Sequence, residues 1–477
     1  MSSPPNILFI FPDQWRSDAL SCLGHPVAIT PHVDQLAAKG TTFTSAYSNC
    51  PICIPARACL MSGRTPNGVG RFGWHTGLPF QAYEPSMMTC LRDGGYQTML
   101  SGKTHFHPER LHLGYEQMVL ADADSDAGND YTRWLTAQTG ARLQPNLKRL
   151  NGNSLIVEPW THDESLHNTN FTTAAALRML ENRDPTRPFF LQVGYHRPHP
   201  PFDPPVEYWV RFRDVELPPV PRGTWAERFD LPTADPEAET GRMHPTLFDR
   251  MRRGYFASIA HVDSQIGELI THLKRNGLFE KTLIVFCSDH GEQLGDHWLY
   301  RKSTALEGSA GIPLIVKPPA DWQCPRGNQI QAPVALHDIM PTLLDAANAP
   351  TPESVEGKSL LPLVRDGRAS WRTHVHCEQC HGPLGAWQCV TDGKRKYVWL
   401  SESGDELFFD LEIDPREQTN LADQADRADE IKVWRDRLIS ELAQRSEDGF
   451  VNDGRLVPGT RTPTARQWLI EWEAGAK

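Results

Sequence analysis

The stretch Asn6-Ile7-Leu8-Phe9-Ile10-Phe11-Pro12-Asp13-Gln14 places a short, continuous apolar run directly before two polar side chains. An apolar run of this length without polar alternation is typical of a strand buried on both faces of a parallel sheet. In open α/β sheets, ligands bind beyond the carboxyl ends of such strands. The stretch therefore predicts an α/β fold in which Asp13 and Gln14 lie at the ligand-binding edge.

Further segments fit the same combination of buried strands and amphipathic helices. Helices are expected over residues 31–40 and, much longer, over about 247–276, each stopped by a glycine. Buried strands are predicted at four places: 96–100, 188–195, 282–287 and 312–317. Segment 200–245 is rich in proline and charge without clear periodicity, so we expect a long surface excursion over the site.

The pattern changes near the C-terminal end of the chain. Short β-like runs at 389–391 and 396–400 precede a predicted helix over about 425–445. The following residues are too rich in turn formers for a core element. The chain is expected to divide into three parts: a large α/β domain over 1–367, a small α+β domain over 368–445, and a tail over 446–477.

Composition excludes several classes of protein. Apolar residues make up 39% of the 477, and the net charge is −11, which argues against a nucleic-acid partner. No apolar stretch approaches a membrane span, and the N-terminus lacks a leader pattern. Ten cysteines without an export signal are best accommodated as thiols in a reducing compartment, so we expect a cytoplasmic protein.

Three side chains that follow predicted strands are candidate metal ligands. Asp289 and His290 come directly after strand 282–287 and are followed by a glycine that lets the backbone turn away, while Asp13 follows the first strand. The alternative interpretation of Asp289 is a turn or helix cap. Gln14 could add an amide oxygen. Oxygen-rich sites favour Ca²⁺, whereas an imidazole shifts the preference towards Mn²⁺, so Ca²⁺ is expected with Mn²⁺ as the alternative.

The pentapeptide Cys53-Ile54-Pro55-Ala56-Arg57 has a proline two residues and an arginine four residues after its cysteine. Enzymes that oxidise cysteine to formylglycine recognise this pattern. Most free cysteines are simply small buried hydrophobes, and Cys50, which lacks the proline and arginine, should stay a thiol. With Asp13 and Asp289-His290, the chain resembles the formylglycine-dependent type I sulfatases of the alkaline phosphatase superfamily, near the arylsulfatase, choline sulfatase and phosphonate monoester hydrolase branch.

This resemblance implies a fold, an activity and a maturation partner. The fold would be alkaline-phosphatase-like, with a mixed, mostly parallel sheet sandwiched by helices. The activity would be hydrolysis of small sulfate monoesters, with a hydrated formylglycine at position 53 as the nucleophile and one divalent metal held by Asp13, Asp289, His290 and residue 53. A formylglycine-generating or sulfatase-maturing enzyme would be needed. Many relatives carry an aspartate where this chain has Gln14.

Further side chains have expected roles around that nucleophile. Arg57 lies one helical turn beyond Cys53 if a helix begins there, and could orient the diol. Lys103 and His105 follow a predicted strand and, as alternate residues of an extended segment, would point together at the substrate. By resemblance, His199 and Lys302 assist the leaving alkoxide and His105 takes a proton from the diol. The substrate-contacting residues would be Trp74 and His75.

Two rival interpretations remain open. The phosphonate monoester hydrolase/phosphodiesterase branch also uses formylglycine, although Lys103 and His105 favour sulfate esters. Cys377-Glu378-Gln379-Cys380-His381 matches the C-x-x-C-H pattern of haem attachment, or contributes to a zinc site. No export signal supports haem attachment, and incidental thiols are the simpler interpretation. The alcohol part of the substrate is not predicted by the sequence.

The tail carries apolar residues that a free terminus has no reason to contain. Trp468, Leu469, Ile470 and Trp472 follow the turn-rich stretch. Buried aromatic anchors are what an interface needs. We therefore expect a homo-oligomer with the tail at its interface, and the alternative is a tail folded back on its own subunit.

Overall fold

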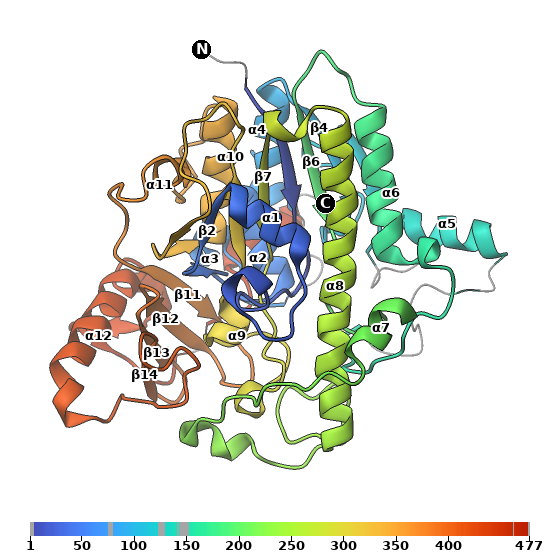
Figure 1. Cartoon of the computed structure of the whole chain (residues 1–477). Helices are drawn as coiled ribbons and strands as arrows, with labels where there is room; N and C mark the ends of the chain where they lie inside the picture. The colour runs from blue at the N-terminus through green and yellow to red at the C-terminus, as the bar shows by residue number, and fades with distance from the viewer. Residues whose placement is uncertain are drawn as a thin grey trace.

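The computed structural model describes residues 4–74, 80–122, 129–140, 143, 152–460 and 462–475. Its centre is an eight-stranded sheet with helices on both faces (Figure 1). The strands lie in the order β5 (Gln117–Leu120), β4 (Gln97–Gly102), β6 (Phe189–Gly194), β1 (Asn6–Ile10), β7 (Thr282–Cys287), β8 (Leu314–Lys317), β2 (Thr41–Phe43) and β9 (Asn328–Ile330). Neighbours are parallel except at β8, which runs antiparallel to both β7 and β2. The predicted mixed, mostly parallel sheet is confirmed.

The first apolar stretch of the chain forms the central strand β1. It lies between β6 and β7, with Leu8 opposite Leu191 on one side and Ile284 on the other. Because side chains alternate along a strand, Leu8 and Ile10 enter one hydrophobic core while Ile7 and Phe9 enter the other. Burial on both faces explains why the stretch has no polar alternation.

Each core is closed by its own set of helices. The core that contains Leu8 is covered by α1 (Pro31–Lys39), α6 (Asn168–Glu181), α7 (Val206–Phe212) and the long α8 (Pro245–Arg275), which runs the length of that face in Figure 1. The opposite core is covered by α2 (Cys53–Ser62), α3 (Pro66–Val69), α4 (Met87–Asp93), α10 (Ile339–Ala347) and α11 (Leu361–Arg365). A separate small cluster packs α5 (Asp130–Thr139) near β5.

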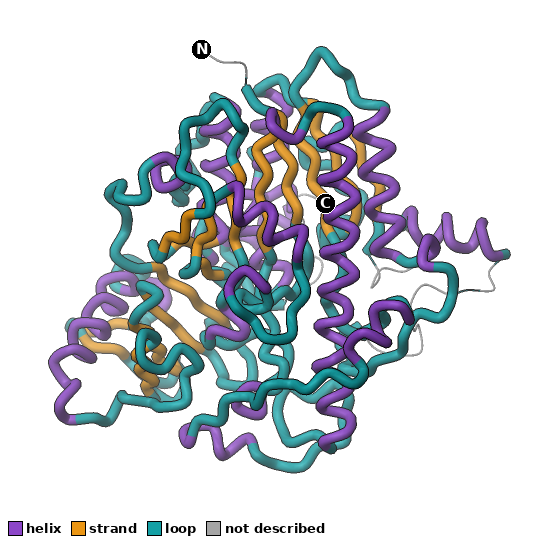
Figure 2. The backbone as a smooth tube through the Cα atoms, in the orientation of Figure 1, coloured by secondary structure: helices purple, strands orange, loops and turns teal. Residues whose placement is uncertain are grey.

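A second, antiparallel sheet lies beside the first (Figure 2). Its strands in order are β11 (Val375–Gln379), β12 (Trp387–Thr391), β13 (Arg395–Leu400) and β14 (Glu406–Asp410). One face packs on α9 (Glu307–Ala310) and the pair β3 (Ala46–Tyr47) and β10 (Val334–Ala335); the other is covered by α12 (Ala428–Leu442). The small C-terminal domain of the predicted fold class is thereby confirmed.

The tail packs against its own chain. It forms a small hairpin, β15 (Val451–Asn452) and β16 (Arg455–Leu456), and ends in α13 (Gln467–Gly475). Ala465 and Leu469 are buried in the core beneath α2. Trp468, Ile470 and Trp472 remain about two-fifths exposed. A role of this helix in assembly stays a prediction.

The remaining sequence expectations differ from the structure in detail. Segment 200–245 is not wholly irregular, because α7 lies within it. Near its end, the backbone carbonyl of Glu239 accepts a hydrogen bond from the Tyr300 N–H. The predicted helix over 425–445 is α-helical only from 428 to 442. Within the described ranges, none of the helices has the length and apolar character needed to cross a membrane.

Candidate active site

Four neighbouring parallel strands bring the candidate residues to one edge of the sheet. Asp13 follows β1, Lys103 follows β4, the segment that carries His199 follows β6, and Asp289 follows β7. These strands are adjacent in the order β4-β6-β1-β7. Their carboxyl ends therefore meet, and residues separated by up to 276 positions in the sequence lie within contact distance of one another.

Close strand packing aims Lys103 into this edge. Gly102 has a φ of 111°, and a Cβ on it would lie 2.0 Å from the carbonyl oxygen of Gly194. The Lys103 N–H donates to that same carbonyl at 2.8 Å. Only glycine accommodates both the left-handed backbone and the close approach. We conclude that the residue before Lys103 is a glycine for steric reasons.

Cys53 begins helix α2, after an extended Ile52. Its Sγ atom is fully buried and lies 3.2 Å from His290 Nε2 and 3.9 Å from Asp13 Oδ1. Arg57, one turn further on, is also buried, and its guanidinium contacts both carboxylates, Asp13 Oδ2 at 3.1 Å and Asp289 Oδ2 at 3.0 Å. The helix begins at Cys53, so Cys53 and Arg57 lie one turn apart on the same face.

The side chains predicted to bind metal form one compact group. Ligand atoms of Asp13, Cys53, Asp289 and His290 all lie within 4.8 Å of one another, and no other such group occurs in the part of the chain that the structure describes. His290 Nδ1 donates to the Gly291 carbonyl at 2.9 Å, which leaves Nε2 free as a ligand. Two carboxylates and one neutral imidazole fit a divalent cation.

Gln14 lies beside this group and is oriented by two hydrogen bonds. Its Nε2 donates to Glu292 Oε2, and its Oε1 accepts from Lys302 Nζ at 2.8 Å. The amide oxygen therefore faces the interior of the site, as an oxygen ligand would.

Lys302 lies between Cys53 and His199 and contacts both. Its Nζ lies 3.2 Å from Cys53 Sγ and 3.0 Å from His199 Nε2. His199 Nδ1 donates to the carbonyl of Pro200 at 2.7 Å, so Nε2 accepts from the lysine. Both side chains predicted to act on the leaving oxygen thus meet beside residue 53.

Burial and charge set the protonation states. Burial alone would raise the pKa of the Asp13 carboxyl, but Lys103, with His199 and Arg57, holds that pKa well below its usual range. Burial lowers the pKa of His290, which keeps the imidazole neutral. Burial, with Asp13 nearby, raises the pKa of the Cys53 thiol to about 12. An unmodified Cys53 is consequently a poor nucleophile at neutral pH, because the thiolate is the reactive form.

Lys103 and His105 do not lie on one extended segment as predicted. His105 has a φ of 59°, so the alternation argument fails at this residue. Lys103 instead forms an ion pair with Asp13 at 3.1 Å, whereas the His105 ring packs edge-on against Trp74, with ring centroids 5.1 Å apart. Burial and Lys103 lower the pKa of His105 to about 4. Trp74 is 41% exposed at the rim; His75 lies outside the described residues.

Several residues of the site were missed by the sequence analysis. Asp122 Oδ1 lies 3.6 Å from Lys103 Nζ and 3.4 Å from His196 Nδ1, and the His196 ring packs against the His199 ring with centroids 5.1 Å apart. The Tyr255 hydroxyl of α8 donates to the Gln14 carbonyl at 2.9 Å. The carboxylate of Glu292 accepts a hydrogen bond from the side-chain amide of Gln14. Of these residues, only Glu292 could have been found from the sequence, because it directly follows Asp289-His290-Gly291.

The C-x-x-C-H motif forms no comparable group. Cys377 is buried in β11 opposite Cys389 of β12, while Cys380 Sγ lies 3.0 Å from His381 Nδ1. Burial raises the pKa of Cys380 to about 12. These residues belong to none of the candidate metal groups in the described ranges.

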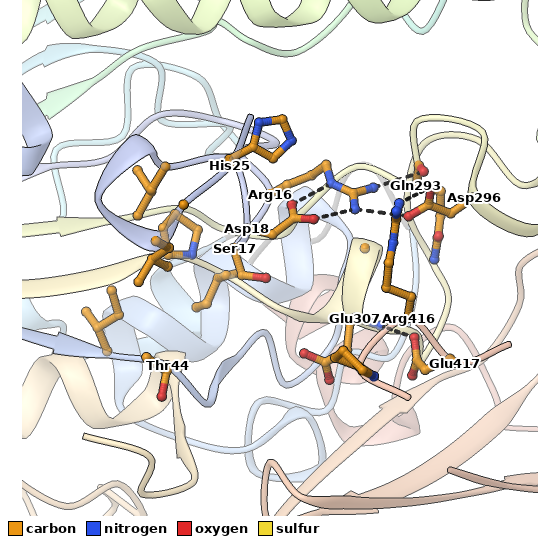
Figure 3. Close-up of a pocket in the computed structure, with 18 of the residues that line it drawn as sticks. Arg16, Ser17, Asp18, His25, Thr44, Gln293, Asp296, Glu307, Arg416 and Glu417 are labelled. Carbon is orange, nitrogen blue, oxygen red and sulfur yellow. Dashed lines mark hydrogen bonds and ion pairs between the residues drawn. The ribbon is translucent and has the colours of Figure 1, made fainter. Parts of the chain in front are cut away.

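A cavity of about 310 Å³ is lined by residues other than the candidate site residues, among them Arg16, Asp18 and Asp296. Figure 3 shows Arg16 between Asp18 and Asp296, whose carboxylates both accept from its guanidinium. Arg16 also donates to the carbonyls of Glu292 and Gln293 at 2.8 and 3.0 Å. Arg16, paired with two carboxylates in this cavity, therefore holds the backbone of the segment that follows Asp289.

Comparisons with known proteins agree with this geometry. The family described as Sulfatase matches residues 5–349, and the family described as N-sulphoglucosamine sulphohydrolase, C-terminal, matches residues 295–445. An arylsulfatase from Clostridium perfringens is 34% identical over 97% of this chain and 99% of its own length. A choline-sulfatase from Rhizobium meliloti is 30% identical over 98% and 90%. The structure of a phosphonate monoester hydrolase from Agrobacterium radiobacter superposes with a TM-score of 0.75, at 26% identity over 96% of this chain and all of that one.

Proposed function

Because this chain belongs to the sulfatase family and is a sulfuric ester hydrolase, we propose that it cleaves small sulfate monoesters with a formylglycine made from Cys53. The observation that carries this proposal is the position of Cys53. It lies at the start of α2, within 3.2 Å of both His290 Nε2 and Lys302 Nζ. A maturing enzyme would have to reach the Cys53-x-Pro55-x-Arg57 segment before it is buried.

Formylglycine hydrate supplies an oxygen nucleophile, and a divalent metal held by Asp13, Asp289, His290 and residue 53 supplies charge neutralisation. Gln14 Oε1 would complete the oxygen ligands. Carboxylates predominate in this donor set, which favours Ca²⁺, with Mn²⁺ as the alternative because of His290.

The residues of the chain divide the remaining work. Arg57 contacts both carboxylates and fixes their orientation towards position 53. Lys302 and His199 hydrogen-bond to each other, and together they can place a proton at the oxygen of the departing alcohol. Lys103 adds a buried positive charge beside Asp13. His105, with its lowered pKa, is neutral at physiological pH and can act as a base.

A panel assay tests the proposal. Matured protein is assayed against nitrophenyl sulfate, phenyl phosphonate monoesters, and sulfated sugars. We expect sulfate esters to give the highest kcat/KM. The proposal is wrong if phosphonate monoesters are hydrolysed much faster than every sulfate ester tried.

A second candidate function is phosphonate monoester or phosphodiester hydrolysis. It is favoured by the match to the Agrobacterium phosphonate monoester hydrolase along nearly the whole chain. Those esters and sulfate monoesters both carry one negative charge, so the net charge of the substrate does not by itself separate the two activities. Matching aryl leaving groups in the panel isolates the preference for sulfur or phosphorus.

We also propose that the protein is a homo-oligomer and that α13 contributes to its interface. The support is the pair of partly exposed indoles, Trp468 and Trp472, beside Ile470. Truncation after Arg445 should change the mass measured by light scattering, and a monomeric full-length protein would refute the idea. All ten cysteines are free, which supports a reducing compartment such as the cytoplasm.

A further inference from the structure

Glu292 is a buried carboxylate that none of the roles above explains. It lies three residues after Asp289 and is fully buried. No ion pair to its carboxylate occurs among the residues that the structure describes. Burying a carboxylate without a counter-ion is costly unless hydrogen-bond donors satisfy it. A residue kept at this cost within the site calls for a function.

Three amide donors satisfy this carboxylate. Oε1 accepts from the backbone N–H groups of Leu294, at 2.8 Å, and Arg301, at 2.6 Å. Oε2 accepts from the side chain of Gln14. The three bonds connect the loop after β1 with both ends of the segment from 294 to 301.

All three donor residues have a left-handed backbone. The φ angles are 68° at Gln14, 52° at Leu294 and 62° at Arg301. For residues other than glycine such conformations cost free energy, and they persist where the surroundings fix them, most often at functional sites. One carboxylate therefore secures three strained turns around the nucleophile.

The hydrogen bond to Gln14 also decides which way its amide points. A carboxylate accepts only from the NH₂ group, and an ammonium donates only to the carbonyl oxygen. With Nε2 on Glu292, the amide presents Oε1 to Lys302 Nζ at 2.8 Å. Glu292 is therefore connected to Lys302 in two ways. The Gln14 amide links it to the Lys302 ammonium, and the Arg301 N–H links it to the backbone just before Lys302.

We propose that Glu292 is a positioning residue that sets the Gln14 amide and holds the Lys302 ammonium between residue 53 and His199. This inference rests on the proposed function, in which Lys302 and His199 assist the departing alcohol. Glu292 itself contacts no reacting atom.

The substitution Glu292→Gln tests the orientation argument with almost no change in shape. A glutamine offers one acceptor oxygen and one donor nitrogen. If its oxygen keeps the two backbone N–H groups, its nitrogen faces Gln14 Nε2, donor against donor. Gln14 must then turn over and present its NH₂ to Lys302. The double variant Gln14→Glu/Glu292→Gln restores an acceptor at both places.

The experiment is a double-mutant cycle on matured, metal-loaded protein. Wild type, both single variants and the double variant are assayed with aryl sulfates whose phenols have increasing pKa, and their thermal unfolding is followed. We expect Glu292→Gln to lower kcat about 10²-fold on the poorest leaving groups and much less on nitrophenyl sulfate. The double variant should regain most of this loss. Glu378→Gln, at an equally buried carboxylate paired with Arg445 outside the site, should lower the melting temperature without any leaving-group dependence.

Two results would overturn the proposal. One is a Glu292→Gln enzyme with wild-type kcat and wild-type dependence on the leaving group. The other is a double variant no more active than the weaker single variant; if Glu292→Gln alone does not fold, the folding and activity of the double variant decide. A failure of the sulfate assignment is recognised separately, because the same cycle can then be run on phosphonate monoesters with the same phenols.

Discussion

The two cysteine motifs of this chain have opposite surroundings. Cys53 meets side chains from three distant segments, His290, Lys302 and Asp13, within 4 Å. Cys377 lies in an antiparallel sheet opposite another thiol, Cys389, in an apolar core. Both cysteines are fully buried, so burial does not distinguish them. The difference teaches that a short motif acquires chemistry only where the fold brings polar partners from elsewhere in the sequence.

Replacing Cys53 and Cys377 in turn should give the largest difference in turnover between the two regions. Cys53→Ala removes the precursor of the nucleophile, and we expect kcat to fall by about 10⁴-fold or more, as when other covalent nucleophiles are deleted. Cys377→Ala should leave turnover nearly unchanged and lower stability by about 1 kcal/mol. Steady-state kinetics and chemical unfolding measure the two effects.

Mass spectrometry provides the control for this pair. The thiol-to-aldehyde mass change should be confined to Cys53, with Cys50 and Cys59 unmodified. Protein made without a maturing enzyme should carry cysteine at 53 and be nearly inactive. Full activity with an intact Cys53 thiol would contradict the mechanism.

The next largest difference between the two regions should be in their dependence on metal. A chelator should abolish most of the activity, and Ca²⁺ or Mn²⁺ should restore it, with about one ion bound per chain. At a free metal concentration 100 times the Kd, binding adds about 2.7 kcal/mol to stability, so the melting temperature should fall on chelation. Asp289→Asn should weaken this response. His381→Ala should leave the metal content unchanged; a lower content would assign a metal to the second motif.

Two buried lysines sharpen the contrast further. Lys103 pairs with Asp13 in the site, and Lys396 pairs with Glu307 and Glu417 beneath the small sheet; both are fully buried. Lys103→Ala should lower sulfatase turnover by about 10²–10³-fold, and more than it lowers any phosphodiesterase side activity. Lys396→Ala should mainly cost stability, about 3–5 kcal/mol, because two carboxylates lose their partner. Equal losses of turnover in the two variants would show that the effect of Lys103 is only structural.

The smallest predicted effect concerns the stability of the fold at low pH, which depends on the buried carboxyl of Asp203. Burial would raise the pKa of the Asp203 carboxyl, but Arg197 and His167 hold it well below its usual range. A carboxyl with a lowered pKa in the folded state stabilises the fold above its unfolded pKa of about 3.9 and loses that contribution as the pH falls. The stability of wild type over Asp203→Asn should be about 1–3 kcal/mol at pH 7 and shrink below about pH 4.

Urea unfolding at several pH values measures this difference. Asp214→Asn, at a carboxylate whose side chain is 80% exposed, serves as the control and should show almost no effect at any pH. A difference between wild type and Asp203→Asn that stays constant from pH 7 to pH 3 would contradict the argument.

Much of this protein was determined by its sequence alone. Apolar stretches without alternation predicted β1 and β7, and the polar residues after them predicted Asp13, Asp289 and His290 at one edge, because local chain geometry encodes these features. The spacing of Cys53 and Arg57 put them one turn apart if a helix began at Cys53, and α2 begins there. Such predictions depend on residues close in the sequence.

Tertiary structure decided what depends on residues far apart. The sequence contains no sign that His105 leaves the extended backbone, that Glu292 holds Gln14 and Arg301, or that Cys377 lies opposite Cys389 in the core of the small sheet. Each of these outcomes is fixed by strand order and by loops that meet after folding. A motif states which chemical groups are available, and packing of distant segments determines their orientation, charge and partners.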